Sequence, residues 1–233
     1  MKNISVCLSP ELIHLFNLSG KTVVVVDILR ATSCITTAFA NGIQSMRPVA
    51  SIGECRALKN DGYVIAGERG GKKVDGFDIG NSPFSYMEPD LKGKKVAITT
   101  TNGTLAIEKS RTADHILIGS FLNIKVLANK INQLDNDLVI HCAGWKGSVN
   151  AEDTVFAGAL IEQLSTNYHP STDDASVAHA LYLHNKKDLL TYVSQSSHAN
   201  RLKGFGIMQD VEYCLEYDKY DIVPYLKNDV III

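Results

Sequence analysis

The stretch Val23 to Thr37, VVVVDILRATSCITT, decides the fold that the sequence predicts. Four consecutive valines indicate a strand buried on both faces of a parallel sheet, because a strand with one solvated face would alternate apolar and polar residues. A polar corner follows at Asp27, and the residues from Ala31 to Ala40 predict a helix. This order is typical of an open α/β sheet, in which ligands bind outside the carboxyl ends of the strands.

Three side chains that could bind or process an anion lie in the six residues after the valine run. Asp27 could hold a cation, Arg30 could bind a phosphate or sulfonate, and Thr32 offers a hydroxyl donor. The alternative is structural, with Asp27 capping the following helix and pairing with Arg30. We favour a functional site, because an apolar strand seldom ends in two opposite charges for packing reasons alone.

The segments around this stretch alternate between strand and helix patterns. Short apolar runs predict strands at Ile4 to Leu8, Ser45 to Val49, Tyr63 to Ala66, Lys95 to Thr99, His115 to Gly119, Asp137 to Cys142 and Val223 to Ile233. Helices are predicted between most of them, and four short helices between Asp173 and Glu216. The alternation predicts an α/β sheet with parallel strands. The 233 residues could form one large domain or two small, interlocked lobes, divided at about residue 90 into 1–90 and 91–233.

A second polar corner follows the strand Lys95 to Thr99. The sequence TTTNGT at Thr99 to Thr104 ends this strand in a turn rich in hydroxyl and amide groups, just before a helix. These threonines could also be ordinary strand residues with a cap. Two such corners facing each other would form one anion pocket, with donors at Thr101, Asn102, Gly103 and Thr104.

The glycine-rich segment from Gly67 to Asp90 interrupts the pattern of strands and helices. A loop of this length inside a compact domain is usually functional or disordered. Its polar residues are too specific for a mere linker, and they supply further candidate site residues: Glu68, Arg69, Asp75, Asp78, Asn81 and Ser82.

Composition excludes several classes of partner. Lys plus Arg number 23 and Asp plus Glu 25, so the formal charge of -2 predicts no long-range attraction to nucleic acid or to an anionic membrane. The five cysteines are scattered and never spaced as C-x-x-C, which argues against a disulfide framework or a zinc site. The sequence shows no signal peptide and no apolar run near the length of a membrane span, so we expect a cytoplasmic protein.

The acids favour Mg²⁺ over other metals, because His and Cys ligands are not clustered. Glu152 and Asp153 follow Asn150 at a predicted helix start, where stabilisation of the helix explains them nearly as well as metal binding. We interpret His141 as a core histidine and Trp145 as a packing or interface residue. The candidate metal ligands are Asp27, Glu68, Asp78, Glu152 and Asp153.

The usual phosphate motifs are absent. No G-x-x-x-x-G-K-[ST] occurs, and Gly67, Gly70 and Gly71 lack the spacing of a dinucleotide fingerprint. Leu29 stands where a D-x-D phosphatase would have its second aspartate, and no cysteine is followed by an arginine at the distance typical of thiol-dependent phosphatases. The mechanism that stays consistent with the sequence is metal-assisted attack by water, in which arginine and backbone donors stabilise the phosphoryl group.

Six blocks in register resemble the 2-phosphosulfolactate phosphatases, enzymes of the coenzyme M route. They are VVVVDILRATSCITTAFANG, AGERGG, GFDIGNSP, TTTNGT, CAGWKG with AEDTVFAG, and GFGIMQDVEYC, which together span nearly the whole chain. The segment from Ser165 to Asn185 is the least familiar.

The resemblance implies a three-layer α/β/α fold with two related lobes, and Mg²⁺-dependent hydrolysis of 2-phospho-3-sulfolactate to sulfolactate and phosphate. We assign the roles inside the blocks by chemistry. The expected catalytic residues are Asp27, Arg30, Glu68, Arg69 and Asp153, and the expected substrate-binding residues are Thr32, Asn81, Ser82, Thr101, Asn102, Gly103 and Thr104.

Two other functions stay open from the sequence. One is hydrolysis of another 2-phosphorylated hydroxy acid without a sulfonate, and the other is non-catalytic binding of phosphorylated metabolites. The carboxylates at Asp27 and Glu68 favour an enzyme, because buried acids without a metal would oppose anion binding. The apolar tail from Val230 to Ile233 predicts burial by the fold or by a second subunit in a homodimer.

Overall fold

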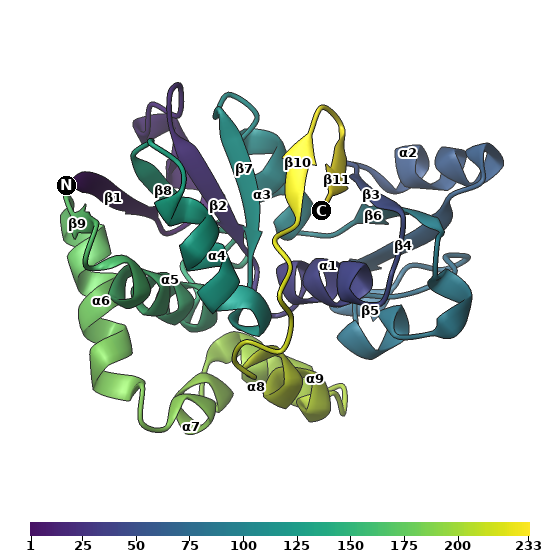
Figure 1. The fold of residues 1–233 in the computed structure, drawn as a ribbon. Coiled ribbons are helices and arrows are strands. Elements are labelled where there is room, and N and C mark those ends of the chain that lie inside the picture. The colour runs from purple at the N-terminus through teal and green to yellow at the C-terminus, as the bar shows by residue number, and fades with distance from the viewer.

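A computed structural model describes residues 1–233 as an eleven-stranded, mostly parallel sheet covered by helices on both faces. This confirms the predicted three-layer α/β/α class (Figure 1). The strands are β1 (Lys2–Cys7), β2 (Thr22–Val26), β3 (Ser45–Pro48), β4 (Val64–Arg69), β5 (Lys72–Lys73), β6 (Lys95–Thr99), β7 (His115–Gly119), β8 (Leu138–Cys142), β9 (Tyr168–Pro170), β10 (Tyr225–Lys227) and β11 (Val230–Ile232).

The α-helices are α1 (Ala31–Ala40), α2 (Ile52–Ala57), α3 (Gly103–Lys109), α4 (Ile124–Asn132), α5 (Ala151–Leu164), α6 (Asp173–Asn185), α7 (Leu189–Ser194), α8 (Ser197–Lys203) and α9 (Met208–Cys214). Short 3-10 helices are η1 (Pro10–Leu15), η2 (Leu58–Asp61), η3 (Pro83–Tyr86), η4 (Pro89–Leu91) and η5 (Phe121–Asn123). None of the helices combines the length and the apolar composition needed to cross a membrane.

The central strand β2 is buried on both faces, as its valines predict. Val23 and Val25 pack in a core cluster with side chains of α1 and α3. Val24 and Val26 pack in a second cluster with side chains of α4 and α5. All four valines are 0% exposed. The valine run therefore separates the two helical layers.

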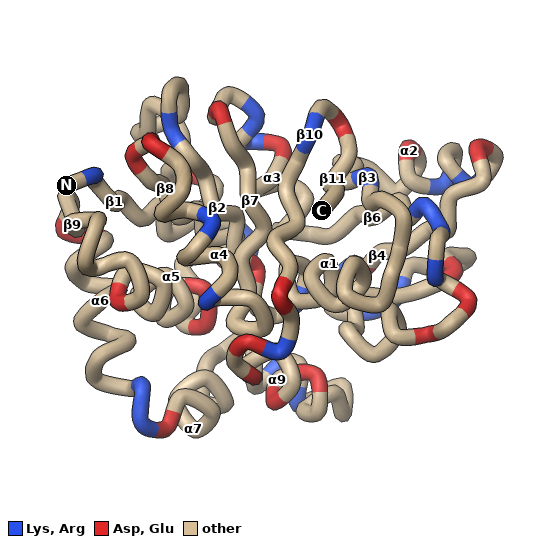
Figure 2. Tube along the Cα trace, in the orientation of Figure 1, with Lys and Arg blue, Asp and Glu red and all other residues tan.

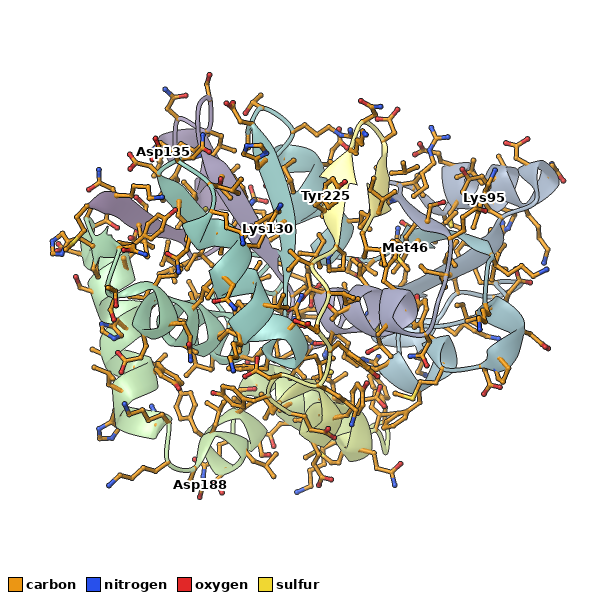
Figure 3. All side chains as sticks on the ribbon, in the orientation of Figure 1. Met46, Lys95, Lys130, Asp135, Asp188 and Tyr225 are labelled. Atoms are coloured by element: carbon orange, nitrogen blue, oxygen red, sulfur yellow. The ribbon has the colours of Figure 1, made fainter.

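The sheet contains two parallel groups joined by the C-terminal hairpin. One group has the order β4–β6–β3 and the other β7–β2–β8–β1–β9, with β11 and β10 between them. The yellow hairpin lies between the groups in Figure 1, and the labelled Met46 and Tyr225 mark its two joins in Figure 3. Tyr225 pairs with Leu117, and Ile231 pairs with Met46. Each group contains strands that precede residue 90 and strands that follow it. The division into two lobes at about residue 90 stays a prediction.

The predicted burial of the tail is confirmed in part within the chain, because Ile231 is fully buried in the hairpin whereas Ile233 is 59% exposed. The predicted loop at Gly67 to Asp90 is wrong in part: β4 continues through Arg69 and turns into the short antiparallel strand β5. Gly70 and Gly71 make this turn with positive φ, which glycine adopts without a steric penalty.

Charges of both signs are interspersed along the chain, as Figure 2 shows.

Candidate active site

A pocket lies where the loops after β2, β4, β6 and β8 meet helix α8. Its lining combines acidic, basic and amide side chains with few apolar ones: Asp27, Leu29, Arg30, Glu68, Gly71, Asn81, Asn102, Trp145, His198, Arg201 and Leu202. The free space inside is about 10 Å³, about what one water molecule needs. The site is therefore nearly closed in this conformation.

The corner after β2 is held by a side chain of the helix that follows it. The Thr32 hydroxyl accepts from the Asp27 N–H (3.0 Å) and donates to the Asp27 carbonyl (2.9 Å). Thr32 thus shapes the loop and does not line the pocket. The pairing of Asp27 with Arg30 in the structural alternative is wrong, because the ion-pair partner of Arg30 is Asp210. The Asp27 carboxylate does accept from the N–H of Ala31, the first residue of α1.

The corner after β6 repeats this device, in line with the predicted similarity of the two corners. The Thr104 hydroxyl accepts from the Thr100 N–H (3.2 Å) and donates to the Thr100 carbonyl (2.9 Å). The two corners also touch, because a Cβ on Gly103 would lie 2.8 Å from Asp27 Oδ2. Glycine is thus required where the corners meet.

Asp27 is 6% exposed and lines the pocket, and its carboxylate accepts one backbone hydrogen bond, from the Ala31 N–H, which lowers its pKa in part. Burial is the main cause that raises the pKa of Asp27 to about 6. The charge of His198 lowers this pKa, and the charges of Glu68 and Glu152 raise it. Such an uncompensated acid is costly to the fold and is typical of a site that binds a cation or exchanges a proton.

Glu68 ties the ends of two strands together. Its Oε1 accepts from the Thr101 N–H (2.7 Å) and its Oε2 from the Gly71 N–H (2.8 Å). These bonds leave each oxygen a further lone pair toward the pocket. Glu68 therefore lines the same pocket as Asp27, and its charge raises the pKa of Asp27.

Asp153 is fully engaged in holding the fold. Its Oδ1 accepts from the Ile28 N–H (2.8 Å), and its Oδ2 accepts from the Gly144 N–H (3.0 Å) and the Asn150 amide (2.9 Å). Burial, with the nearby charges of Asp27 and Glu152, raises the pKa of Asp153. Its carboxylate does not line the pocket. Asn150 in turn accepts from the Asp153 N–H (3.0 Å), which confirms it as the helix N-cap.

Glu152 and His198 form a buried pair, with 2.6 Å between Glu152 Oε1 and His198 Nδ1. The second oxygen, Oε2, is buried without a partner. His198 stacks on Trp145, with ring centroids 5.2 Å apart, and Arg201 lies over the same indole at 3.4 Å from its centroid. The interpretation of Trp145 as a mere packing residue is therefore wrong, because it supports two side chains of the pocket.

Arg30 forms a buried ion pair with Asp210, and Ser82 donates to the same carboxylate (3.1 Å). Ser82 therefore supports the ion pair and does not reach the pocket itself. Asn81 and Asn102 do line the pocket. Asn81 Oδ1 is buried without a partner, as is the hydroxyl of Thr101.

Two candidates lie outside this group. Asp78 is 36% exposed, pairs with Lys59 (2.6 Å) and accepts from the Ile65 N–H (3.0 Å). The guanidinium of Arg69 donates to the Glu68 carbonyl (2.7 Å) and the Thr99 hydroxyl (2.9 Å), and it does not line the pocket. The structure thus brings Asp27, Glu68 and Arg30 together but not Asp78 or Arg69.

Sequence reasoning missed His198 and Arg201 as functional residues. They lie three positions apart on α8, so both can face one side of the helix. The only sequence signal is this short SHANR segment in a region that reads as surface helices. Histidine and arginine at that spacing are common on solvated faces, which is why the pattern carries little information alone.

The fold and the pocket define a class of site: an α/β sheet whose strand ends bring carboxylates, guanidinium groups and a His–Glu pair to one small polar pocket. A family profile described as 2-phosphosulpholactate phosphatase matches residues 7–229.

Three relatives are each named a probable 2-phosphosulfolactate phosphatase. The protein of Caldanaerobacter subterraneus subsp. tengcongensis is 40% identical over 220 residues, covering 92% of this chain and 91% of its own. The protein of Clostridium acetobutylicum is 41% identical over 218 residues, with 91% and 92% covered. The Thermotoga maritima protein is 38% identical over 214 residues, with 91% and 92% covered. This chain belongs to the 2-phosphosulfolactate phosphatase family, and it is a phosphoric monoester hydrolase.

Proposed function

We propose that this phosphatase hydrolyses 2-phospho-3-sulfolactate to 3-sulfolactate and phosphate with the help of Mg²⁺. The family match over residues 7–229 carries the proposal. The pocket supports it, because Arg30 and Arg201 offer positive charge to a substrate with several anionic groups, and Asp27 and Glu68 offer oxygen ligands to a cation.

The residues present fit Mg²⁺. No three His, Cys, Asp or Glu side chains are grouped so that they could hold a metal by themselves. Mg²⁺ is usually held by one or two carboxylates completed by water and substrate oxygen, and Asp27 and Glu68 both line this pocket. Asp27 and Glu68 would hold the ion, with the free oxygen of Glu152 as a further candidate. The bound ion would offset the charge that develops on the phosphoryl group.

His198 is the residue that we assign to proton transfer. Its Nδ1 is bonded to Glu152 Oε1, so Nε2 is the nitrogen left to face a substrate in the pocket. An alkyl phosphate has a poor leaving group, and donation of a proton from Nε2 to the departing oxygen would assist bond cleavage. Glu152 would orient the ring and stabilise its positive charge.

Arg30 is assigned to the transferred phosphoryl group. Asp210 and the Gly71 carbonyl occupy some of its N–H groups, and a guanidinium has five. The others remain for a phosphate oxygen. The ion pair with Asp210 keeps this guanidinium in place before substrate arrives, which is what electrostatic stabilisation of a transition state requires.

The test is phosphate release from 2-phospho-3-sulfolactate and from 2-phospholactate, each with Mg²⁺ and with EDTA. We expect release from the sulfonate substrate that requires both Mg²⁺ and Asp27, as judged with Asp27→Asn. Equal release from 2-phospholactate would shift the substrate to hydroxy acids without a sulfonate. No release from either, with folded protein and metal present, would contradict the proposal. A strong preference for the sulfonate substrate would support a role in coenzyme M synthesis.

A further inference from the structure

The two guanidinium groups of the pocket differ in what they bind. Arg30 forms a buried ion pair with Asp210 and donates to the Gly71 carbonyl at 3.4 Å. Arg201 forms no ion pair and no side-chain hydrogen bond, and its Nε is buried without a partner. Arg201 is therefore the cation of the pocket whose charge is not matched by a carboxylate in contact with it.

Trp145 holds this unmatched guanidinium in place. The guanidinium carbon of Arg201 lies 3.4 Å from the indole centroid, and the same indole stacks on His198 at 5.2 Å with 27° between the ring planes. A guanidinium stacked on an indole keeps its N–H groups free at its edge. Burial lowers the pKa of Arg201, and the charges of Glu68 and Glu152 offset this only in part, since neither carboxylate forms an ion pair with it.

We propose that Arg201 binds the acid group of the substrate that is not transferred, a carboxylate or sulfonate on the carbon skeleton beside the phosphate. This inference rests on the proposed function and adds a residue that selects the substrate. The planar fork of a guanidinium matches two oxygens of such a group, and loss of one charged hydrogen-bonding partner costs about 10- to 100-fold in binding.

The position of Arg201 on α8 gives this recognition a second consequence. His198 and Arg201 lie on the same short helix and against the same indole, so an acid group that fixes Arg201 also fixes His198. A substrate without the second acid group would lack the contact with Arg201 that fixes the position of α8. Arg201 is thus a binding residue that also positions the proton donor.

The experiment compares Arg201→Met with the natural protein on 2-phospho-3-sulfolactate, which carries both acid groups, and on the methyl ester of 2-phospholactate, which keeps the phosphate and has neither. We expect kcat/KM of Arg201→Met to fall about 10- to 100-fold on 2-phospho-3-sulfolactate, and this loss to exceed the loss on the ester by at least about tenfold. Equal losses on both substrates would overturn the inference, because Arg201 would then serve the phosphate or the fold. No loss on either would overturn it as well.

A binding measurement separates this inference from the proposed function. Calorimetric titration with 3-sulfolactate, which has acid groups and no phosphate, needs no turnover. Arg201→Met should bind it about tenfold or more weakly than the natural protein, and unchanged binding would overturn the inference. Lys203→Met is the matched control, because Lys203 is exposed on the same helix, outside the pocket, and loses the same charge. Failure of the natural protein to release phosphate would count against the proposed function alone.

Discussion

Two walls of the pocket are built in different ways. The strand-end wall consists of Asp27, Glu68 and Asn102, on loops whose backbone is closed by buried hydrogen bonds from Thr32, Thr104 and Glu68 itself. The helical wall consists of His198, Arg201 and Leu202 on α8. It meets the rest of the site through side chains, namely the pair with Glu152 and the stack on Trp145.

This difference indicates how each wall is held. Buried hydrogen bonds to the backbone fix the strand-end wall, whereas α8 is held by Ala199 and Leu202 in the core and by the side-chain contacts of His198 and Arg201. The strand ends thus supply the carboxylates of the pocket, and the helix supplies the imidazole and the second cation.

The largest effect is expected from the strand-end wall. Asp27→Asn should lower kcat/KM by about 10³-fold or more, because the variant loses a charged oxygen ligand where the phosphoryl group reacts. Steady-state phosphate release measures the change, and circular dichroism checks that the fold is kept. Activity within tenfold of the natural protein would remove Asp27 from the site.

The helical wall should give a smaller loss that is specific to kcat. His198→Gln should lower kcat by about 10²-fold, because general acid catalysis is lost while the phosphate contacts remain. Its pH–rate profile should lose the limb that belongs to the proton donor. Glu152→Gln in the His198→Gln background should add little, since both residues act as one unit. Additive losses would show that Glu152 acts independently, as a metal ligand would.

Asp153 tests whether a buried carboxylate near the strand ends must be catalytic. Asp153→Asn should lower the free energy of unfolding by about 3 kcal/mol, because one acceptor oxygen becomes an N–H₂ group facing N–H donors. Urea denaturation measures it. Full stability together with a loss of activity would show that Asp153 has a chemical role beyond anchoring Ile28 and Gly144.

Asp27 should give the opposite change in stability. Because its pKa rises from 3.8 to about 6 on folding, the native state binds more protons than the unfolded state between these values, and stability falls as pH rises through this window. Asp27→Asn should therefore be about 2 kcal/mol more stable than the natural protein at pH 8 in EDTA. The difference should vanish near pH 4. An equal difference at both pH values would contradict the burial argument.

The smallest effect is expected from Asp78→Asn, which makes the same chemical change outside the pocket. We expect kcat/KM within about twofold of the natural protein and a stability loss below about 1 kcal/mol, because the ion pair with Lys59 is solvated. A large loss of Mg²⁺-dependent activity would return Asp78 to the metal site predicted from the sequence.

Local patterns accounted for much of the fold and for part of the site. The valines of β2 and the small residues of α1 are each recognisable from neighbouring residues alone, and the structure has them where they were predicted. The corners at Asp27 and Thr100 were recognisable for the same reason. The extension of β4 through Arg69 was not, because its glycines resemble a loop until β5 pairs with it.

The sequence by itself determined the α/β class, the buried central strand and the polar corners at the strand ends, because these depend on the periodicity and size of adjacent residues. Only the tertiary structure decided which charges meet. Arg30 pairs with Asp210, 180 positions away, and Glu152 with His198, 46 positions away. In the folded chain Arg201 forms no ion pair with a carboxylate, whereas Asp78 forms an ion pair with Lys59. Such pairings depend on where distant segments fold, and no spacing along the chain records them.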